Sequence, residues 1–459
     1  MAARPLVARQ PNERLQSLIQ EAGCSNAGLA RRVNLRGAEH GLDLRYDKTS
    51  VARWLRGQQP RGQAPAVIAE AIGRKLGRPV SVDEIGMADG KNTSSSIGLH
   101  FSPSLAGAVE QVCELWRSDV GRRDFLNGAS VAASALVEPS RDWLITGTDP
   151  QVARMGGPRV GPADVEAVHA TTQMLVELDH RFGSGHVRPV VVHYLNSVVS
   201  GLLAGSYRED TGRRLFAAVA RLTELAGYMA IDTGQPGLAQ RYYIQALRLA
   251  QAAGDRAYGA YVLAASMSHL AANLGNPREI AQLARAAQEG ARGAATPTAM
   301  SLFYVAEARG HALLGDVRSC ESVAGRAAEA MEHSRPEEDP DWIGHFDRAY
   351  LADELAHCHR DLEQPMQSAR YAEEALKTHP ETRVRRRAVD LVLLATAQLQ
   401  LHDLDQACET GARAVELMSG LRSARGAEYL DDFRRRLEPY REQRAVREFQ
   451  ARTLAEAAA

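Results

Sequence analysis

The sequence predicts an all-α protein in which a small helical domain precedes an α-solenoid, a curved stack of helix pairs. Alanine, the strongest helix former, accounts for 75 of the 459 residues, whereas the aromatic residues that favour strands account for only 5%. Apolar residues recur at i, i+3 and i+4 along most of the chain, which is the spacing of one helix face. A pattern of small residues also repeats through the C-terminal half.

Composition excludes a membrane span and wholesale disorder. No stretch of about 18 uncharged apolar residues occurs, which is the length that a membrane span requires. Hydrophobic residues make up 45% of the chain and charged residues 24%, which is typical of globular domains. The five cysteines are scattered singly and their number is odd, so we expect reduced thiols and a cytoplasmic location.

Charge is distributed unevenly along the chain. The net charge is −1, yet residues 1–90 carry 14 Lys and Arg against 9 Asp and Glu, a net charge of +5. The remaining residues carry 41 basic against 47 acidic side chains, a net charge of −6. This asymmetry predicts that the N-terminal part of the chain binds an anionic partner.

Residues 12–86 are expected to form one small domain. Short amphipathic segments follow one another there, and helices this short are stable only when they share a core. Their apolar seams are Leu15, Leu18 and Ile19; Leu29, Ala30 and Val33; Val51, Trp54 and Leu55; and Val67, Ile68, Ile72 and Leu76. Residues 87–100 begin with a polar stretch that contains Gly and Ser, so we expect them to form a linker.

Residues 101–162 are expected to form a connecting helical region, and residues 163–456 a domain of helical repeats. The repeat is a triplet at i, i+4 and i+7 that follows a turn containing Gly, Asp or Pro. The triplets are Ala239/Tyr243/Ala246, Ile280/Ala284/Ala287, Cys320/Ala324/Ala327, Ser368/Ala372/Ala375 and Ala407/Gly411/Ala414. These positions share one helix face, and small side chains there let two antiparallel helices approach closely.

The repeats resemble a tetratricopeptide-repeat array. The resemblance lies in the second-helix positions, where that family has alanine, an aromatic or small residue, and alanine again. The first members of the triplets lie 41, 40, 48 and 39 residues apart. The usual period of the family is about 34 residues, so longer helices or loops are expected here.

The most informative segments are residues 25–33 (SNAGLARRV) and 47–57 (DKTSVARWLRG). On a helical wheel, the positions 48, 49, 52, 53 and 56 fall within one arc of roughly 140°. Val51, Trp54 and Leu55 fall on the opposite side. One short helix therefore combines a buried seam with an exposed face of small, hydroxyl and cationic side chains, which is the combination that a DNA major groove accepts.

These segments resemble the Cro/CI-type (XRE) helix-turn-helix. The whole arrangement is similar to actinobacterial regulators that join such a domain to a tetratricopeptide-like body, some of which restrain differentiation and antibiotic production. The resemblance implies a regulator that binds double-stranded DNA, a repressor if it acts as the members that restrain these processes do, with activation left open. One small head makes few base contacts, so specific recognition favours a homodimer. Twelve residues, 34–45, stand where the family's turn has three or four, and we expect this insertion to lengthen the first motif helix and its turn.

The candidate DNA-binding residues are Asn26, Lys48, Thr49, Ser50, Arg53 and Arg56. By their positions in the motif, Lys48, Thr49 and Arg53 are candidates for base-edge contacts. Asn26 and Arg56 are candidates for phosphate contacts, and Ser50 lies at the edge of the face without a defined role. Trp54 is expected to belong to the core.

The repeat domain offers one candidate binding surface. Tyr242, Tyr243, Tyr258 and Tyr261 fall on consecutive predicted helices, where they either fill the core or line a groove for a peptide or small ligand. His357, Cys358 and His359 are not expected to bind a metal, because positions i and i+2 face apart on a helix. Nucleotide-binding and acyl-transfer motifs do not occur, so we expect neither a cofactor nor enzymatic activity.

The sequence therefore predicts a cytoplasmic, sequence-specific transcriptional regulator. Its repeat domain would mediate dimerisation, or bind a peptide, small-molecule or protein effector. The alternative is a protein-interaction adaptor of the tetratricopeptide type, whose helix-turn-helix domain has little or no specific DNA binding. The twelve-residue insertion is the feature that keeps this alternative open.

Overall fold

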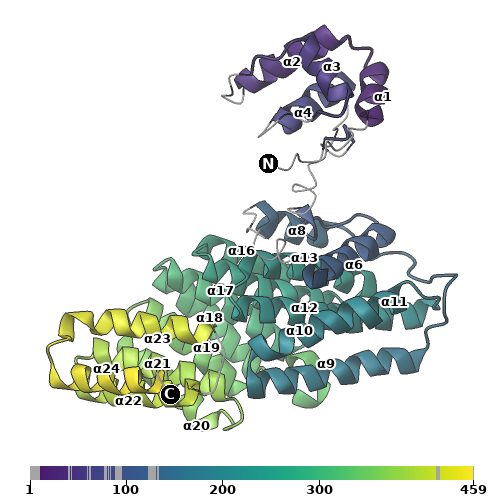
Figure 1. Cartoon of the computed structure of the whole chain (residues 1–459). Coiled ribbons are helices and arrows are strands. Elements are labelled where there is room, and N and C mark those ends of the chain that lie inside the picture. Colours follow the sequence, from purple (N-terminus) through teal and green to yellow (C-terminus); the bar gives the residue numbers. More distant parts are fainter. Residues whose placement is uncertain are drawn as a thin grey trace, which may run out of the picture. The chain divides into compact units, whose positions relative to one another are not determined.

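The computed structural model is all-helical and divides into two compact units, the head (residues 1–96) and the body (residues 97–459) (Figure 1). Isolated β-bridges, and no strands, accompany the helices in the part of the chain that the structure describes. None of its described helices is both long and apolar enough to cross a membrane. The described residues are 11–39, 42, 44–58, 60, 64–76, 80, 82, 84–87, 96–121, 131, 134–419 and 424–457.

Short helices surround one small core in the head. They are α1 (Glu13–Glu21), α2 (Asn26–Glu39), α3 (Lys48–Leu55) and α4 (Ala64–Leu76). Asn12 joins the two ends of this domain: its side chain accepts a hydrogen bond from the backbone of Leu15 (3.0 Å) and donates to the carbonyls of Ile85 (2.8 Å) and Gly86 (3.2 Å). Its backbone N–H also donates to Leu55 O at 2.9 Å, which ties the start of α1 to the end of α3.

The predicted linker, residues 87–100, includes residues at its start that belong to the head and residues at its end that belong to the body. Met87 is buried in the core of the head. Ile97 packs against the core of the body, and the side chain of Gln245 donates hydrogen bonds to the carbonyls of Gly98 (2.9 Å) and His100 (3.0 Å). Residues 88–95 of the predicted linker lie outside the described residues.

Helices follow one another through the whole described body. The α-helices are α6 (Leu105–Gly121), α8 (Ser134–Ile145), α9 (Pro162–Phe182), α10 (Ser184–Tyr194), α11 (Ser200–Leu203), α12 (Glu209–Asp232), α13 (Pro236–Ala253), α14 (Arg256–Tyr261), α15 (Ser268–Asn273), α16 (Pro277–Gly290), α17 (Pro297–Leu313), α18 (Val317–Glu332), α19 (Arg348–Asp361), α20 (Pro365–Thr378), α21 (Val384–Gln400), α22 (Leu404–Met418), α23 (Ala424–Leu437) and α24 (Arg444–Ala457). The π-helical segments η1 (Leu195–Val199) and η2 (Val262–Met267) continue α10 into α11 and α14 into α15. The 3-10 segments are η3 (Pro336–Glu338), η4 (Asp341–Ile343) and η5 (Glu438–Tyr440).

The repeat triplets lie where the helices of each pair pack together. The pairs are α12 with α13, α15 with α16, α17 with α18, α19 with α20, and α21 with α22. Almost every triplet residue is buried, and Ala324 is half-buried. At Gly411 a Cβ atom would come within 2.6 Å of the Phe433 ring, so the small residue there is required by close packing. The predicted α-solenoid of paired helices is confirmed.

The connecting region predicted at 101–162 is an integral layer of the body. Trp116 of α6 and Trp143 of α8 are fully buried in the same core as α12 and α13. A Cβ atom at Gly290 of α16 would come within 2.3 Å of the Trp143 ring, so this helix approaches α8 closely. Arg248 of α13 is buried and forms a bidentate ion pair with Asp149 (2.7 and 2.9 Å). The region is therefore held by the repeats and does not connect two separate parts.

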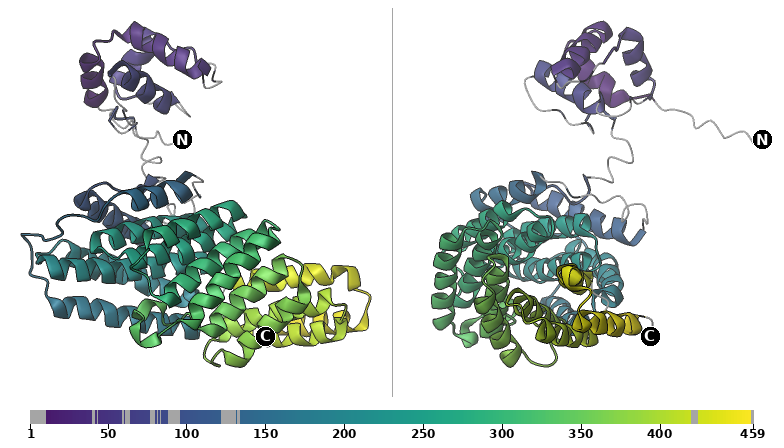
Figure 2. Two further views of the ribbon diagram at one scale, coloured as in Figure 1. Left: turned by 180° about the vertical axis from the view of Figure 1, so that it is seen from behind. Right: turned by 90° about the vertical axis from the view of Figure 1, so that its left-hand side faces the viewer.

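The stack of helix pairs curves until its later part contacts its beginning (Figure 2). Arg385, in the first turn of α21, pairs with Asp179 of α9 at 2.8 Å and with Asp232 of α12 at 3.0 Å. Both carboxylates are almost fully buried. This contact joins residues that are 206 and 153 positions apart in the chain, and it brings the walls of an internal cavity together.

The turn inside each helix pair contains one residue with positive φ, a backbone conformation that favours glycine. Gly234, Gly275 and Gly315 adopt positive φ at the end of the first helix of their pairs, and Glu363 (φ 56°) and His402 (φ 64°) hold the same position in the last two pairs. Holding a residue other than glycine in the left-handed conformation costs about 1–2 kcal/mol of folding free energy. Replacing that residue with glycine removes this cost, but it also stabilises the unfolded chain by about 0.5–1 kcal/mol, because glycine has more backbone freedom there. Glu363→Gly and His402→Gly should each raise the free energy of unfolding by up to ~1 kcal/mol in denaturant titrations.

The matched control is Glu373→Gly, at an exposed position inside α20. It should lower the free energy of unfolding by about 1 kcal/mol, because glycine is a poor helix former. Equal losses of stability in all three variants would show that the turn geometry assigned to residues 363 and 402 is wrong.

Candidate functional site

Helix α3 of the head begins at a reciprocal cap. The Asp47 carboxylate accepts hydrogen bonds from the backbone N–H groups of Thr49 (3.1 Å) and Ser50 (2.8 Å), and the Ser50 hydroxyl donates to it at 2.9 Å. The Thr49 hydroxyl donates to both carboxylate oxygens, at 2.8 and 2.9 Å. The hydrogen bond from the Thr49 hydroxyl, followed by those from Ser50, lowers the pKa of Asp47 to about 2. The cap fixes the first turn of α3 and keeps Asp47 ionised at neutral pH.

The inner face of α3 is locked into the core of the head. Val51 and Trp54 are buried, and the Tyr46 ring meets the Trp54 ring edge-on at a centroid distance of 4.9 Å. The Asn34 side chain donates to Tyr46 O and accepts from Tyr46 N, both at 2.8 Å. The insertion therefore lengthens α2 to Glu39, as expected, and the chain returns to α2 before α3 begins.

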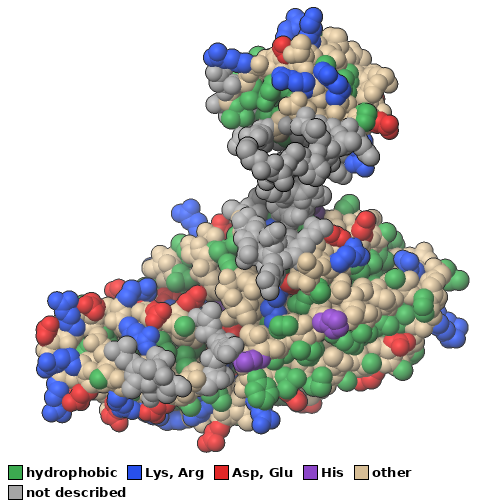
Figure 3. All heavy atoms as spheres, viewed as in Figure 1, with side chains coloured by type: hydrophobic (Ala, Val, Ile, Leu, Met, Phe, Trp, Pro, Cys, Tyr) green, Lys and Arg blue, Asp and Glu red, His purple; other side chains and the backbone are tan. Residues whose placement is uncertain are grey.

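The outer face of α3 carries the predicted cations. Lys48, Thr49, Arg53 and Arg56 are exposed around the half-buried Ala52. The Arg53 guanidinium donates to the Ser50 hydroxyl at 3.3 Å, and Arg56 Nε donates to Ala52 O at 3.2 Å. In the view of Figure 3, Lys and Arg side chains stand on the head with few Asp or Glu among them, whereas both signs are interspersed on the body.

Two of the predicted DNA-binding residues are less exposed than the cations of α3. Ser50 is only 5% exposed and belongs to the helix cap, so its assignment to the DNA-binding face is wrong. Asn26 is half-buried in the first turn of α2, where the Ser25 hydroxyl accepts the capping hydrogen bond from Gly28 N at 3.1 Å. The sequence interpretation missed Asp47, although an Asp followed three positions later by Ser at a helix start is typical of a reciprocal cap.

The four tyrosines of the body separate into two groups. Tyr242 lines neither cavity: it is fully buried and its hydroxyl donates to Asp119 of α6 at 2.6 Å, so of the two expected roles it fills the core. Tyr243 is also fully buried; it lies against Gly227 of α12, where a Cβ atom would come within 2.7 Å of its ring, and it lines a small cavity. Tyr258 and Tyr261 line the larger cavity.

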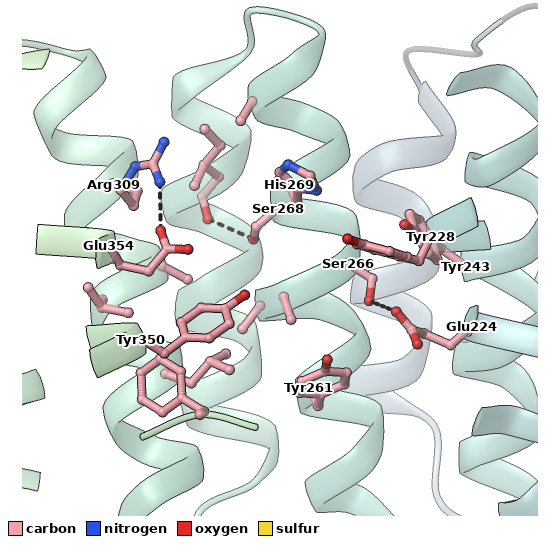
Figure 4. Close-up of a pocket in the computed structure, with 18 residues that line it drawn as sticks. Glu224, Tyr228, Tyr243, Tyr261, Ser266, Ser268, His269, Arg309, Tyr350 and Glu354 are labelled. Atoms are coloured by element: carbon pink, nitrogen blue, oxygen red, sulfur yellow. Dashed lines mark hydrogen bonds and ion pairs between the residues drawn. The ribbon is translucent and has the colours of Figure 1, made fainter. Parts of the chain in front are cut away.

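Two cavities inside the body share part of their walls. One has a volume of about 670 Å³ and is lined by α9, α12, α14, η4 and the first turn of α21. The other has a volume of about 110 Å³ and is lined mainly by α12, η2, α17 and α19. Glu224, Tyr228, Tyr261 and Tyr350 line both cavities. Figure 4 shows Glu224 accepting a hydrogen bond from Ser266 of η2 (2.5 Å), beside Tyr261.

A buried polar cluster lies behind the cavity wall. Asp353 of α19, His379 and Asp390 of α21 are almost fully buried and offer ligand atoms within 4.8 Å of one another. Asp353 is also paired with Arg386, and His357 Nε2 lies 3.5 Å from Asp353 Oδ1. Burial, and then the neighbouring Asp353, raises the pKa of Asp390 well above its usual range. The set could hold a divalent metal, and one proton shared by the two carboxylates would neutralise it equally well.

One family model matches the head. The family model described as the SP15 N-terminal domain matches residues 15–88, which begin in α1 and end one residue beyond the buried Met87. No curated protein matches the chain. The matched segment contains α3 and its cap.

The raised pKa of Asp390 makes the stability of the fold depend on pH. Because the pKa of Asp390 is higher in the folded chain than in the unfolded chain, this carboxyl destabilises the fold increasingly as the pH rises above 3.8. Asp390→Asn should therefore raise the thermal midpoint at pH 7, and the gain should shrink as the pH falls toward 4. Asp353→Asn should instead lower the thermal midpoint, because Arg386 loses its shortest ion pair and keeps only the 3.9 Å contact with Glu354.

Thermal unfolding of both variants across this pH range checks the assignment. A loss of stability in Asp390→Asn at pH 7 would contradict a protonated Asp390. If a chelator also destabilised the parent chain but not Asp390→Asn, the cluster would hold a metal and not a proton.

Proposed function

We propose that the chain is a sequence-specific DNA-binding transcriptional regulator and that α3 is its recognition helix. The observation that carries this proposal is the two-sided character of α3. Its inner face is held by Val51 and Trp54, while Lys48, Arg53 and Arg56 stand exposed on the other side. A helix that enters a major groove needs this division between a fixed inner face and a cationic outer face.

The details of the outer face support base reading at its start and phosphate binding at its end. Ala52 is small, so it leaves room for α3 to approach the floor of a groove. Thr49 directs its hydroxyl hydrogen to Asp47, which leaves a methyl group and a lone pair for a base edge. Arg56 is the C-terminal capping residue, and a long cation at that place reaches toward a phosphate backbone.

The charge of Asp47 is the main feature that opposes DNA binding by this face. Its carboxylate is exposed, yet it is engaged by the N–H groups of α3 and by the hydroxyls of Thr49 and Ser50. The partial positive charge at the helix start offsets the carboxylate charge. The excess of basic residues in residues 1–90 further favours an anionic partner.

The proposal extends to the whole chain by resemblance. One small head makes few base contacts, so specific recognition favours a homodimer on paired half-sites. A cytoplasmic repressor without enzymatic activity, with a body that dimerises or binds an effector, is the reading that the actinobacterial resemblance supports. The alternative adaptor is favoured by the long connection between α2 and α3, and opposed by the bonds of Asn34 to Tyr46, which fix the approach to α3.

Two substitutions on α3 test whether its outer face binds DNA. With the full-length chain and a duplex selected from a random pool, Thr49→Val should weaken binding by about 1–3 kcal/mol and relax the preference at one base position. Arg56→Gln should weaken binding to all sequences alike and reduce the salt dependence by about one phosphate contact. Fluorescence anisotropy at several salt concentrations measures both effects.

Two further variants serve as controls. Ser50→Ala should lower the stability of the head by about 1 kcal/mol, because the Ser50 hydroxyl completes the cap of α3. Arg117→Gln removes an exposed arginine from α6 of the body and should bind as the parent does. Parent-like binding by both α3 variants would rule out α3 as the recognition helix, and a pool that yields no preferred sequence would favour the adaptor.

A further inference from the structure

The larger cavity of the body has an aromatic wall in which Trp342 is tilted against two stacked tyrosine rings, by 67° from Tyr258 and 52° from Tyr261. The rings of Tyr258 and Tyr261 are stacked, with centroids 5.6 Å apart and planes 17° apart. Trp342 packs against both, at 5.5 Å from Tyr258 and 5.1 Å from Tyr261. The π-helical segment η2 begins directly after Tyr261, and such segments are frequent at functional sites. A wall of this kind stacks against a planar ligand.

Most of the arginines in the cavity wall already have acidic partners. Arg385 pairs with Asp179 and Asp232, Arg386 pairs with Asp353, and Arg383 pairs with Asp347 at 3.1 Å. These ion pairs hold α21 in place. The positive charges of these arginines are therefore balanced by acidic side chains of the protein itself.

Arg221 of α12 differs from the other arginines. Among the described residues, its guanidinium has no acidic partner, and its buried Nε atom has no hydrogen-bond partner. Its guanidinium carbon lies over the Tyr258 ring, 5.8 Å from the ring centroid, in a cation–π contact. A guanidinium that rests on a buried ring and has no acidic partner is suited to a carboxylate brought by a ligand.

The hydroxyl groups of Tyr258 and Tyr261 add hydrogen-bond donors to this part of the cavity wall. Burial raises the pKa values of Tyr258 and Tyr261 well above the usual range, so both hydroxyls remain protonated. Neither hydroxyl makes a hydrogen bond within the described residues. Burial also raises the pKa of Glu224 to about 7, so its negative charge is reduced at neutral pH. The other acids of the lining that have no ion-pair partner, Glu177 and Asp341, are exposed.

We propose that the larger cavity binds a small planar organic acid. Its carboxylate would pair with Arg221 and accept hydrogen bonds from the tyrosine hydroxyls, while its ring would lie against Tyr258, Tyr261 and Trp342. The volume of about 670 Å³ falls within the range of small-molecule sites, roughly 300–1,000 Å³. The proposal concerns the body alone and holds whether or not the head binds DNA.

The test uses 2-naphthoate and its uncharged amide as probes, titrated into the full-length chain by calorimetry. For a ligand of this size we expect 2-naphthoate to bind with a Kd of about 1 mM or tighter. The amide should bind about tenfold more weakly. Arg221→Gln should weaken naphthoate binding by about tenfold and leave amide binding unchanged, because only the carboxylate needs the guanidinium.

A matched arginine outside the cavity provides the control. Arg326 is exposed on α18 and stacks over the Tyr304 ring at 4.1 Å, so Arg326→Gln removes the same type of contact elsewhere in the body. It should bind both probes as the parent does. No saturable naphthoate binding up to about 5 mM, equal affinity for acid and amide, or an equal loss in both arginine variants would each overturn the proposal.

Discussion

The close approach of paired helices is the constraint on which the body depends. Ala239 and Ala246 are small and fully buried where α12 and α13 pack together, Gly411 lies against Phe433 of α23, and each pair turns through a residue with positive φ. Pairs built in this way have a fixed angle, so their stacking has a fixed curvature. The curvature brings α21 back to α9 and α12, where Arg385 joins two buried aspartates.

This closure places charged groups in the interior of the body, where each needs a partner. The arginines of the first turn of α21 lie at a helix end that disfavours cations, and they are retained with acidic partners from α9, α12 and α19. Behind them, Asp353 and Asp390 face each other and avoid two adjacent charges because Asp390 keeps its proton. Arg221 is the exception among the described cavity arginines, and for this reason it carries the inference of a ligand carboxylate.

The fold was predictable from local patterns in the sequence, whereas contacts between residues that are distant in the chain were not. The triplets and the core seams of the head were predictable because they repeat at helical spacing. The integration of residues 101–162 was not, because Trp143 packs against Gly290, which is far away in the chain. Tyr242 and Tyr243 are neighbours in sequence but face different helices, which a list of aromatic residues cannot distinguish. The Asp353, His379 and Asp390 cluster joins three segments that no spacing rule connects. On α3 the exposed cations were predicted correctly, whereas Ser50 was misassigned because the wheel ignores capping.

The functional proposal depends on one contact, in which α3 of the head enters the DNA major groove and contacts base edges. The most direct measurement is the recovery and sequencing of fragmented genomic DNA bound by the full-length protein at two salt concentrations. If α3 contacts base edges, the recovered fragments should share a motif with two spaced half-sites that persists at the higher salt, because base contacts add to the phosphate contacts. Recovery without a motif, lost when the salt is raised, would contradict the functional proposal and would leave only a non-specific attraction between the basic head and DNA.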